Sequence, residues 1–123
     1  MTAAFRALVI DDDPDLLLLV RRTLEFTAGW QVQTAPSGAR GLELARAEPP
    51  DVVLVDLMMP DMDGYEVCRR LKADAATAAV PVVLLTARRE VDEDRLAGIG
   101  AAGFVLKPFQ PQELARRVRE LTG

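Results

Sequence analysis

Residues 51–64 read Asp51-Val-Val-Leu-Val-Asp56-Leu-Met-Met-Pro60-Asp-Met-Asp63-Gly64. Residues 51–55 are almost continuously apolar, which is typical of a strand covered on both faces, as in a parallel sheet between two layers of helices. Residues 56–64 are rich in Asp, Pro and Gly, and this composition predicts a loop. The middle of the chain is therefore expected to hold a buried strand that ends in a carboxylate, followed by a helix from about Tyr65.

The same alternation of short apolar strands and helices continues on both sides of this segment. Further strands are predicted over residues 6–10, 30–34, 81–85 and 104–107, and further helices over 14–28, 37–48, 92–99 and from 111 onward. Parallel neighbours require crossover connections, and here each crossover is a helix. We therefore predict an α/β fold, a flavodoxin-like (βα)5 doubly wound parallel sheet with the strand order 2-1-3-4-5.

Local signals predict the ends of the first helix and its buried face. Asp13 is expected to cap the helix, and Gly29 is expected to end it. Leu16, Val20 and Leu24 recur at the spacing of one helix face, so these three side chains are expected to point into the core.

Length and composition indicate one globular domain, residues 1–123. Half of the residues are apolar, which predicts a packed core, and the net charge of -4 argues against direct binding of nucleic acid or of an anionic membrane. The N-terminus lacks the apolar segment of a signal peptide, and the longest apolar run, residues 16–20, is far shorter than a membrane span. We expect a cytoplasmic protein.

Two residue types are informative because they are scarce. The chain has no histidine, which excludes catalytic triads, most zinc sites and a phosphohistidine of its own. Any step that depends on histidine therefore needs a partner. The single cysteine, Cys68, cannot form an internal disulfide and is expected to be a buried thiol.

Polar side chains stand at the ends of four predicted strands. Asp11 and Asp12 follow the first strand, Asp56 follows the third, Thr86 follows the fourth, and Lys107 ends the fifth. In open α/β sheets, ligands bind outside the carboxyl ends of the strands. Three carboxylates brought together repel one another unless a cation shares the site, and an all-oxygen ligand set without histidine favours Mg²⁺.

The other groups at these strand ends suit phosphoryl transfer. Lys107 offers a compact positive charge, and the Thr86 hydroxyl and the Ala87 N–H can donate to phosphoryl oxygens. A carboxylate nucleophile, a metal, a cation and hydrogen-bond donors together make up such a site.

Over essentially its whole length, the chain resembles the receiver domains of two-component response regulators. The motifs that carry the resemblance are Asp11-Asp12, Asp56-Leu-Met-Met-Pro60-Asp-Met-Asp63-Gly64, Thr86-Ala87 and Lys107-Pro108-Phe109, in this order. Each motif alone is a weak signal, but four of them in order at the ends of the expected strands are specific.

The resemblance implies how the carboxylates act. Asp56 would be the phosphoacceptor, which takes a phosphoryl group from a sensor histidine kinase or a histidine phosphotransfer protein. Asp12, Asp56 and the backbone carbonyl of Met58 would bind Mg²⁺ directly, and Asp11 would hold a metal-bound water. The protein would be a signalling phosphoacceptor and not an enzyme, because it would catalyse only its own phosphorylation and dephosphorylation.

The resemblance also implies how the phosphoryl group is held and sensed. Thr86, the Ala87 N–H and Lys107 would contact the phosphoryl oxygens, and a cis peptide bond between Lys107 and Pro108 would aim the lysine into the site. Phosphorylation would draw the Thr86 hydroxyl inward and let Phe104, the switch aromatic, rotate.

The surface expected to respond comprises the helix over 92–99, the strand near Phe104 and the helix from 111. In winged-helix transcription factors of this family, that surface dimerises through salt bridges with an acidic pair, whose positions Ala101 and Ala102 occupy here. Only a weak homodimer is expected, because exposed ion pairs contribute little. The residues available for such pairs are Asp94 with Arg116, Arg117 or Arg119.

Three alternatives differ from this hypothesis at specific features. A haloacid-dehalogenase-like phosphohydrolase would carry Asp-x-Asp-Gly-Thr after the first strand, whereas here Asp11-x-Asp13 is followed by Pro14-Asp15. A flavodoxin-like FMN module would need a loop that binds phosphate at that place, but the three aspartates found there would repel a phosphate group. A phosphorylation-independent pseudo-receiver would lack part of the site, but every site residue is present. The chain fits both a stand-alone shuttle and the receiver of a larger regulator.

Two further expectations concern the roles of the remaining loop aspartates and the lifetime of the phosphorylated state. Asp13, Asp15, Asp61 and Asp63 are interpreted as cap and turn residues. Met58 and Arg88 lie two residues after Asp56 and Thr86, at positions that flank the path of the hydrolytic water in receivers. Because neither side chain is a small polar group that can orient water, slow dephosphorylation is expected.

Overall fold

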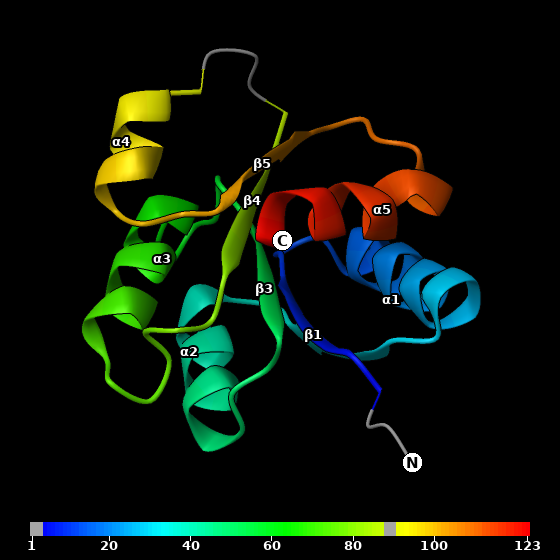
Figure 1. Ribbon diagram of the computed structural model, residues 1–123, viewed down its shortest axis with the longest axis horizontal. Helices are drawn as coiled ribbons and strands as arrows, with labels where there is room; N and C mark the ends of the chain where they lie inside the picture. The colour runs from blue at the N-terminus through cyan, green and yellow to red at the C-terminus, as the bar shows by residue number, and fades with distance from the viewer. Residues whose placement is uncertain (1–3, 88–90) are drawn as a thin grey trace.

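The chain forms a five-stranded parallel sheet with helices on both faces (Figure 1). The structure, a computed structural model, describes residues 4–87 and 91–123. The strands lie in the order β2-β1-β3-β4-β5, so the predicted fold class and strand order are confirmed. The strands are β1 (Arg6–Ile10), β2 (Gln31–Ala35), β3 (Val52–Asp56), β4 (Val82–Thr86) and β5 (Gly103–Leu106); the helices are α1 (Pro14–Ala28), α2 (Gly38–Ala47), α3 (Gly64–Ala73), α4 (Glu93–Gly98) and α5 (Pro111–Thr122).

Two hydrophobic layers hold the helices on the sheet. Helices α1 and α5 cover one face, and α2, α3 and α4 cover the other (Figure 1). Every residue of β3 and β4 is buried, as expected for central strands of a covered parallel sheet. The cysteine, Cys68, is fully buried in the layer under α3, as predicted.

Helix α1 buries a stripe that differs by one residue from the prediction. Leu17, Val20 and Leu24 are buried, whereas Leu16 is only partly buried, although it packs against the same core as predicted. A period of 3.6 residues allows neighbours on one face at spacings of both three and four. The spacing alone therefore did not distinguish Leu16 from Leu17, and packing against the sheet decides between them.

Strands β3 and β4 each begin and end one residue later than predicted. Asp56 pairs with Leu85, and Thr86 pairs with Leu106, so both polar residues belong to the sheet itself. Strand β5 ends one residue before Lys107, whose N–H still donates to the Thr86 carbonyl at 2.6 Å. These site residues are therefore fixed by the hydrogen-bond ladder of the sheet, which holds them more rigidly than a loop would.

Candidate functional site

The carboxyl ends of β1 and β3 bring three carboxylates together. These strands are neighbours in the sheet, with Asp11 and Asp12 directly after β1 and Asp56 at the end of β3. One carboxylate oxygen from each residue lies within 4.8 Å of those of the other two. Asp11 is 1% exposed and Asp56 is 8% exposed, whereas Asp12 is exposed. The cluster is therefore enclosed by protein on one side and open to solvent on the other.

Lys107 reaches this cluster from the end of β5. Its Nζ lies 3.0 Å from Asp11 Oδ2 and 3.3 Å from Asp56 Oδ1. The peptide bond between Lys107 and Pro108 is cis, as the sequence resemblance implied. The other oxygen of Asp11, Oδ1, accepts the backbone N–H of Asp13 at 2.9 Å. One ammonium group is thus shared by two of the three carboxylates.

The charges in this cluster do not balance. Burial raises the pKa of Asp56, the negative charge of Asp11 raises it further, and together they outweigh Lys107 and the Met58 N–H, which lower it. Burial by itself would lower the pKa of Lys107, but hydrogen bonding and attraction to Asp11 and Asp56 raise it above its ordinary value. The ionised form of Asp56 is therefore short of positive charge, and a further cation would stabilise it.

The donor set of the cluster fits Mg²⁺. It consists of carboxylate oxygens, which hard divalent cations prefer, and its exposed side leaves room for the waters that Mg²⁺ usually retains. The imbalance of charge is a second observation in favour of a cation, because Lys107 does not compensate all three carboxylates. The residues that could hold such an ion are Asp11, Asp12 and Asp56.

The loop after β3 is closed tightly against the site. The Gly64 N–H donates to the Leu57 carbonyl at 2.8 Å, and a Cβ at Gly64 would lie 2.8 Å from the carbonyl oxygen of Asp56. Only glycine therefore allows α3 to begin this close to the phosphoacceptor candidate. The Met58 N–H donates to the Asp56 carboxylate, and Met58 is 54% exposed.

The other predicted site residues lie on or next to the two neighbouring strands. Thr86 is buried at the end of β4, and Ala87, which follows it, is exposed. Phe104 lies on β5, which pairs with β4, and it packs, partly buried, against the core under α2, α3 and α4. Arg88 lies outside the described residues. The structure thus brings Thr86 to the strand edge that carries Asp56, with Phe104 on the strand beyond it.

One residue near the site has a contact that the sequence did not predict. Asp61 was interpreted as a turn residue, but its carboxylate accepts the backbone N–H groups of Gly38 and Ala39 in α2. Asp63 has the predicted kind of role, because it caps α3 by accepting the Glu66 N–H at 2.8 Å. The Asp61 contact spans more than twenty residues of sequence and has no local pattern that could have revealed it.

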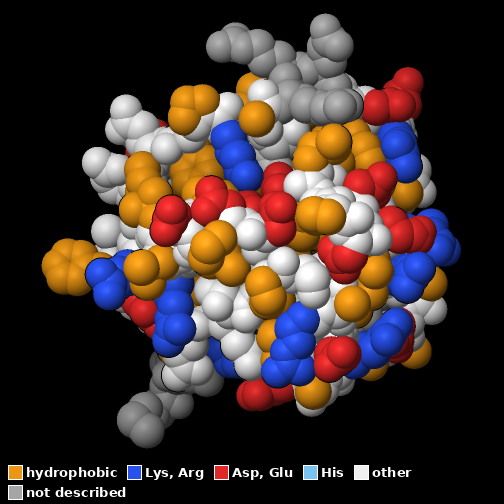
Figure 2. All heavy atoms as spheres, turned by 180° about the vertical axis from the view of Figure 1, so that it is seen from behind, with side chains coloured by type: hydrophobic (Ala, Val, Ile, Leu, Met, Phe, Trp, Pro, Cys, Tyr) orange, Lys and Arg blue, Asp and Glu red, His pale blue; other side chains and the backbone are white. Residues whose placement is uncertain are grey.

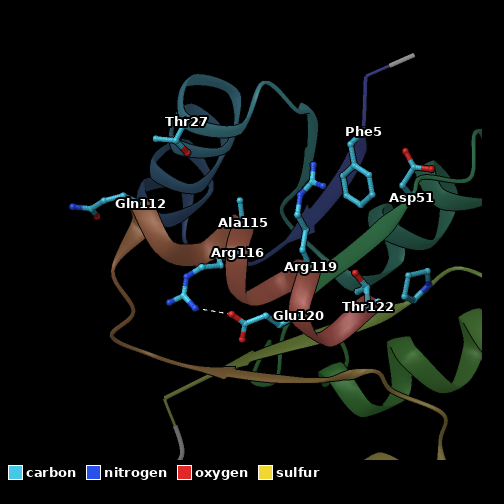
Figure 3. A pocket seen from close by; sticks show the side chains of 11 residues that line it. Phe5, Thr27, Asp51, Gln112, Ala115, Arg116, Arg119, Glu120 and Thr122 are labelled. Atoms are coloured by element: carbon cyan, nitrogen blue, oxygen red, sulfur yellow. Dashed lines mark hydrogen bonds and ion pairs between the residues drawn. The ribbon is translucent and has the colours of Figure 1, made fainter. Parts of the chain in front are cut away.

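A large groove lies at the opposite end of the sheet from the acidic cluster. It has a volume of about 910 Å³ and lies between α5 and the segments that precede β1, β3 and β4 (Figure 3). Within it, Arg116 pairs with Glu120, and the Arg119 guanidinium stacks over the Phe5 ring. These polar groups pair with one another or stack, so the groove offers no constellation for phosphoryl chemistry.

Basic side chains are scattered over the face seen in Figure 2. Acidic side chains gather across the middle of this face, and Lys and Arg side chains form no continuous basic groove among the residues drawn in colour. Among residues 4–87 and 91–123, no helix is long and apolar enough to cross a membrane.

Comparisons with known proteins agree on one family. A family model described as "Response regulator receiver domain" matches residues 7–119. The "DNA-binding dual master transcriptional regulator RpaA" of Synechocystis is 44% identical over 118 residues, which are 94% of this chain and 48% of that protein. The "Probable transcriptional regulatory protein TcrX" of Mycobacterium tuberculosis is 42% identical over 93% of this chain and 48% of its own length. The chain thus spans about half the length of these curated relatives.

A solved structure supports the same likeness. Chemotaxis protein CheY4 of Vibrio cholerae matches with a TM-score of 0.90 and 28% sequence identity, over 97% of this chain and 99% of that one. The similarity therefore includes the whole sheet and both layers of helices.

Proposed function

The chain belongs to the response regulator receiver domain family, and on that basis we propose that Asp56 accepts a phosphoryl group in a Mg²⁺-dependent reaction. The donor would be a histidine of a partner sensor kinase or phosphotransfer protein, since this chain has no histidine of its own. The observation that carries the proposal is the position of Asp56, whose Oδ1 lies 3.3 Å from Lys107 Nζ and whose carboxylate clusters with those of Asp11 and Asp12. The intact mass of the chain after incubation with acetyl phosphate, with Mg²⁺ or with EDTA, tests it.

Each residue of the site would have a distinct part in the transfer. An Asp56 carboxylate oxygen attacks the phosphorus, so that a P–O bond forms while the P–N bond to the donor histidine breaks. Asp12, Asp56 and the Met58 carbonyl would bind Mg²⁺ directly, and Asp11 would bind it through a water. When bound, the metal neutralises charge on the transferred group.

The remaining groups would hold the oxygens of the phosphoryl group. Lys107 supplies a positive charge, and the Thr86 hydroxyl and the Ala87 N–H donate hydrogen bonds. Lys107 would have to leave part of its contact with Asp56 to reach a phosphoryl oxygen. The protein would then act as a signalling phosphoacceptor that promotes only its own phosphorylation and dephosphorylation.

The output of this domain belongs to the same proposal. RpaA and TcrX are named as transcriptional regulators, and we propose that residues 1–123 form one receiver domain that controls an output of that kind without binding nucleic acid itself. The cytoplasmic location expected from the sequence stays a prediction.

We expect Met58→Asn to shorten the lifetime of the aspartyl phosphate by roughly tenfold, well below the ~100-fold that a positioned proton-transfer group can contribute. Met58 is exposed two residues after Asp56, and an asparagine there could orient the attacking water. Loss of the added phosphoryl mass after removal of the phosphodonor measures the rate. Met58→Leu is the matched control and should leave the lifetime unchanged. A wild-type phosphate that decays fast and is not accelerated by Met58→Asn would contradict the prediction.

The proposed switch runs from Thr86 to Phe104 and changes the face formed by α4, β5 and α5. Two of the arginines expected to pair across a dimer have partners within the chain. Arg116 binds Glu113 and Glu120, and Arg119 stacks on Phe5 and Trp30. Arg117 remains the best candidate for a pair with Asp94 of a second copy.

We therefore expect the Mg²⁺-beryllofluoride complex to be mainly monomeric in sedimentation at micromolar concentration, because each exposed ion pair contributes only ~0–1 kcal/mol. Phe104→Ala should change the degree of self-association that sedimentation measures for the Mg²⁺-beryllofluoride complex. A tight dimer that Arg117→Glu abolishes and Phe104→Ala leaves unaffected would contradict both the weak coupling and the proposed switch.

A further inference from the structure

The first turn of α2 is completed by a carboxylate from another part of the chain. The Gly38 N–H donates to Asp61 Oδ1 at 3.2 Å, and the Ala39 N–H donates to Asp61 Oδ2 at 3.0 Å. The next two N–H groups of the helix bond to Ser37, one to its hydroxyl and one to its carbonyl. The Gly41 bond is the first regular bond of the helix, and the three helical N–H groups before it, which have no partner in the helix backbone, are all satisfied, two of them by Asp61.

The charge of Asp61 suits this place. Its slight burial would raise the pKa, but the N–H groups of Ala39 and Gly38 lower it, so the carboxylate stays ionised. A negative charge at a helix N-terminus is also stabilised by the helix dipole. The contact is therefore a favourable link between α2 and the loop over residues 57–63.

Packing supports the same link. A Cβ at Gly38 would lie 2.5 Å from Met62 Cγ, so the loop side chain rests directly on the backbone of the helix. The absence of a side chain at Gly38 allows the loop to approach closely enough for Asp61 to reach both N–H groups. Two neighbouring loop residues thus contact the same turn of α2.

Few other hydrogen bonds hold the middle of this loop. Its ends are fixed by Leu57 and Gly64, which bond to each other, and the Met58 N–H bonds to Asp56 inside the site. The two bonds to Asp61 tie the middle of this loop, residues 59–62, to α2. The position of the Met58 carbonyl therefore depends on a loop that Asp61 anchors to α2.

We propose that Asp61 is a positioning residue, which holds the loop after β3 on α2 so that the Met58 carbonyl and the Asp56 carboxylate stand ready for Mg²⁺. This inference rests on the proposed function of Asp56. Asp61 touches neither metal nor phosphoryl group, and it acts through the loop.

The test measures Mg²⁺ binding apart from phosphorylation. We expect Asp61→Ala to weaken Mg²⁺ binding, measured by calorimetry in the absence of phosphodonor, by about five- to tenfold, at or below the low end of the effects seen for groups that orient metal ligands. Hydrogen exchange of the metal-free protein should become faster in the peptide over residues 57–63. Asp61→Asn keeps one acceptor oxygen, so its Mg²⁺ affinity and its rate of hydrogen exchange should lie between those of Asp61→Ala and wild type.

Asp51→Ala is the matched control. The Asp51 carboxylate also accepts a backbone N–H far away in sequence, that of Arg6 at 2.7 Å, but it lies at the groove opposite the site (Figure 3). Asp51→Ala should lower the free energy of unfolding in urea by an amount similar to that of Asp61→Ala, and it should leave the affinity for Mg²⁺ unchanged. If Asp61→Ala binds Mg²⁺ as wild type does, or if Asp51→Ala weakens binding equally, the positioning role is wrong. A wild-type chain that takes up no phosphoryl group would instead overturn the proposed function.

Discussion

Asp56→Asn should lower the uptake of a phosphoryl group from acetyl phosphate by at least ~10³-fold, the scale of loss when a nucleophile is removed. An amide cannot replace the carboxylate as the attacking group, and it would also remove one carboxylate from the cluster with Asp11 and Asp12 that we propose binds Mg²⁺. The intact mass of the wild-type chain should increase by one phosphoryl group with Mg²⁺ present. The mass of the variant should not change, and EDTA should suppress labelling of the wild type.

Loss of labelling in this variant should not result from unfolding. The pKa of Asp56 is raised in the folded protein, so its ionised form is less favourable there than in the unfolded chain. The stability associated with a protonated Asp56 is present at low pH and is lost as pH rises through the raised pKa. In EDTA at neutral pH, Asp56→Asn should therefore be at least as stable as wild type in urea unfolding. Equal labelling of variant and wild type would mean that another residue is the phosphoacceptor.

Lys107→Ala is expected to slow phosphorylation by ~100- to 1,000-fold, the loss found when one group that stabilises developing charge is removed. It should also reduce the free energy of unfolding in EDTA by about 1–3 kcal/mol, less than the ~3–5 kcal/mol of a fully buried pair, because the Lys107 side chain is 22% exposed. The physical reason is that Asp11 and Asp56 lose the ammonium that lies between them. Added Mg²⁺ should restore more stability to the variant than it adds to wild type.

The pH dependence of this stability has a definite sign. The pKa of Lys107 is raised in the folded state, so its contribution is present below the ordinary lysine pKa and is lost as pH rises through the higher folded value. The contribution of Lys107 should therefore persist at neutral pH and disappear only in strongly alkaline solution.

Lys72 provides the control for Lys107, since the chain has only these two lysines. Its Nζ donates to the carbonyls of Ala78 and Val80, away from the acidic cluster. Lys72→Ala should reduce stability and leave the phosphorylation rate unchanged. If the two variants slowed phosphorylation equally, the effect would be one of general destabilisation, and the role assigned to Lys107 would be wrong.

Much of the fold and most of the candidate site followed from local patterns. The apolar run before Asp56 and the helix signals on both sides predict a covered parallel sheet, and parallel strands have their carboxyl ends at one edge. Residues as distant as Asp11 and Lys107 could therefore be assigned to one site from their places at strand ends. The side chain of Leu17 shows the limit of such patterns, because a helical period alone did not separate it from Leu16.

The sequence by itself determined which elements form, their order and which polar residues stand at the strand ends, because these depend on periodicity and on local turn chemistry. Only the tertiary structure decided how those residues are partnered. The Lys107 ammonium lies between Asp11 and Asp56 because β1, β3 and β5 end at the same edge at distances that no spacing encodes. Asp61 binds N–H groups of the backbone, which every residue except proline carries, so its partners in α2 leave no mark in the amino-acid sequence.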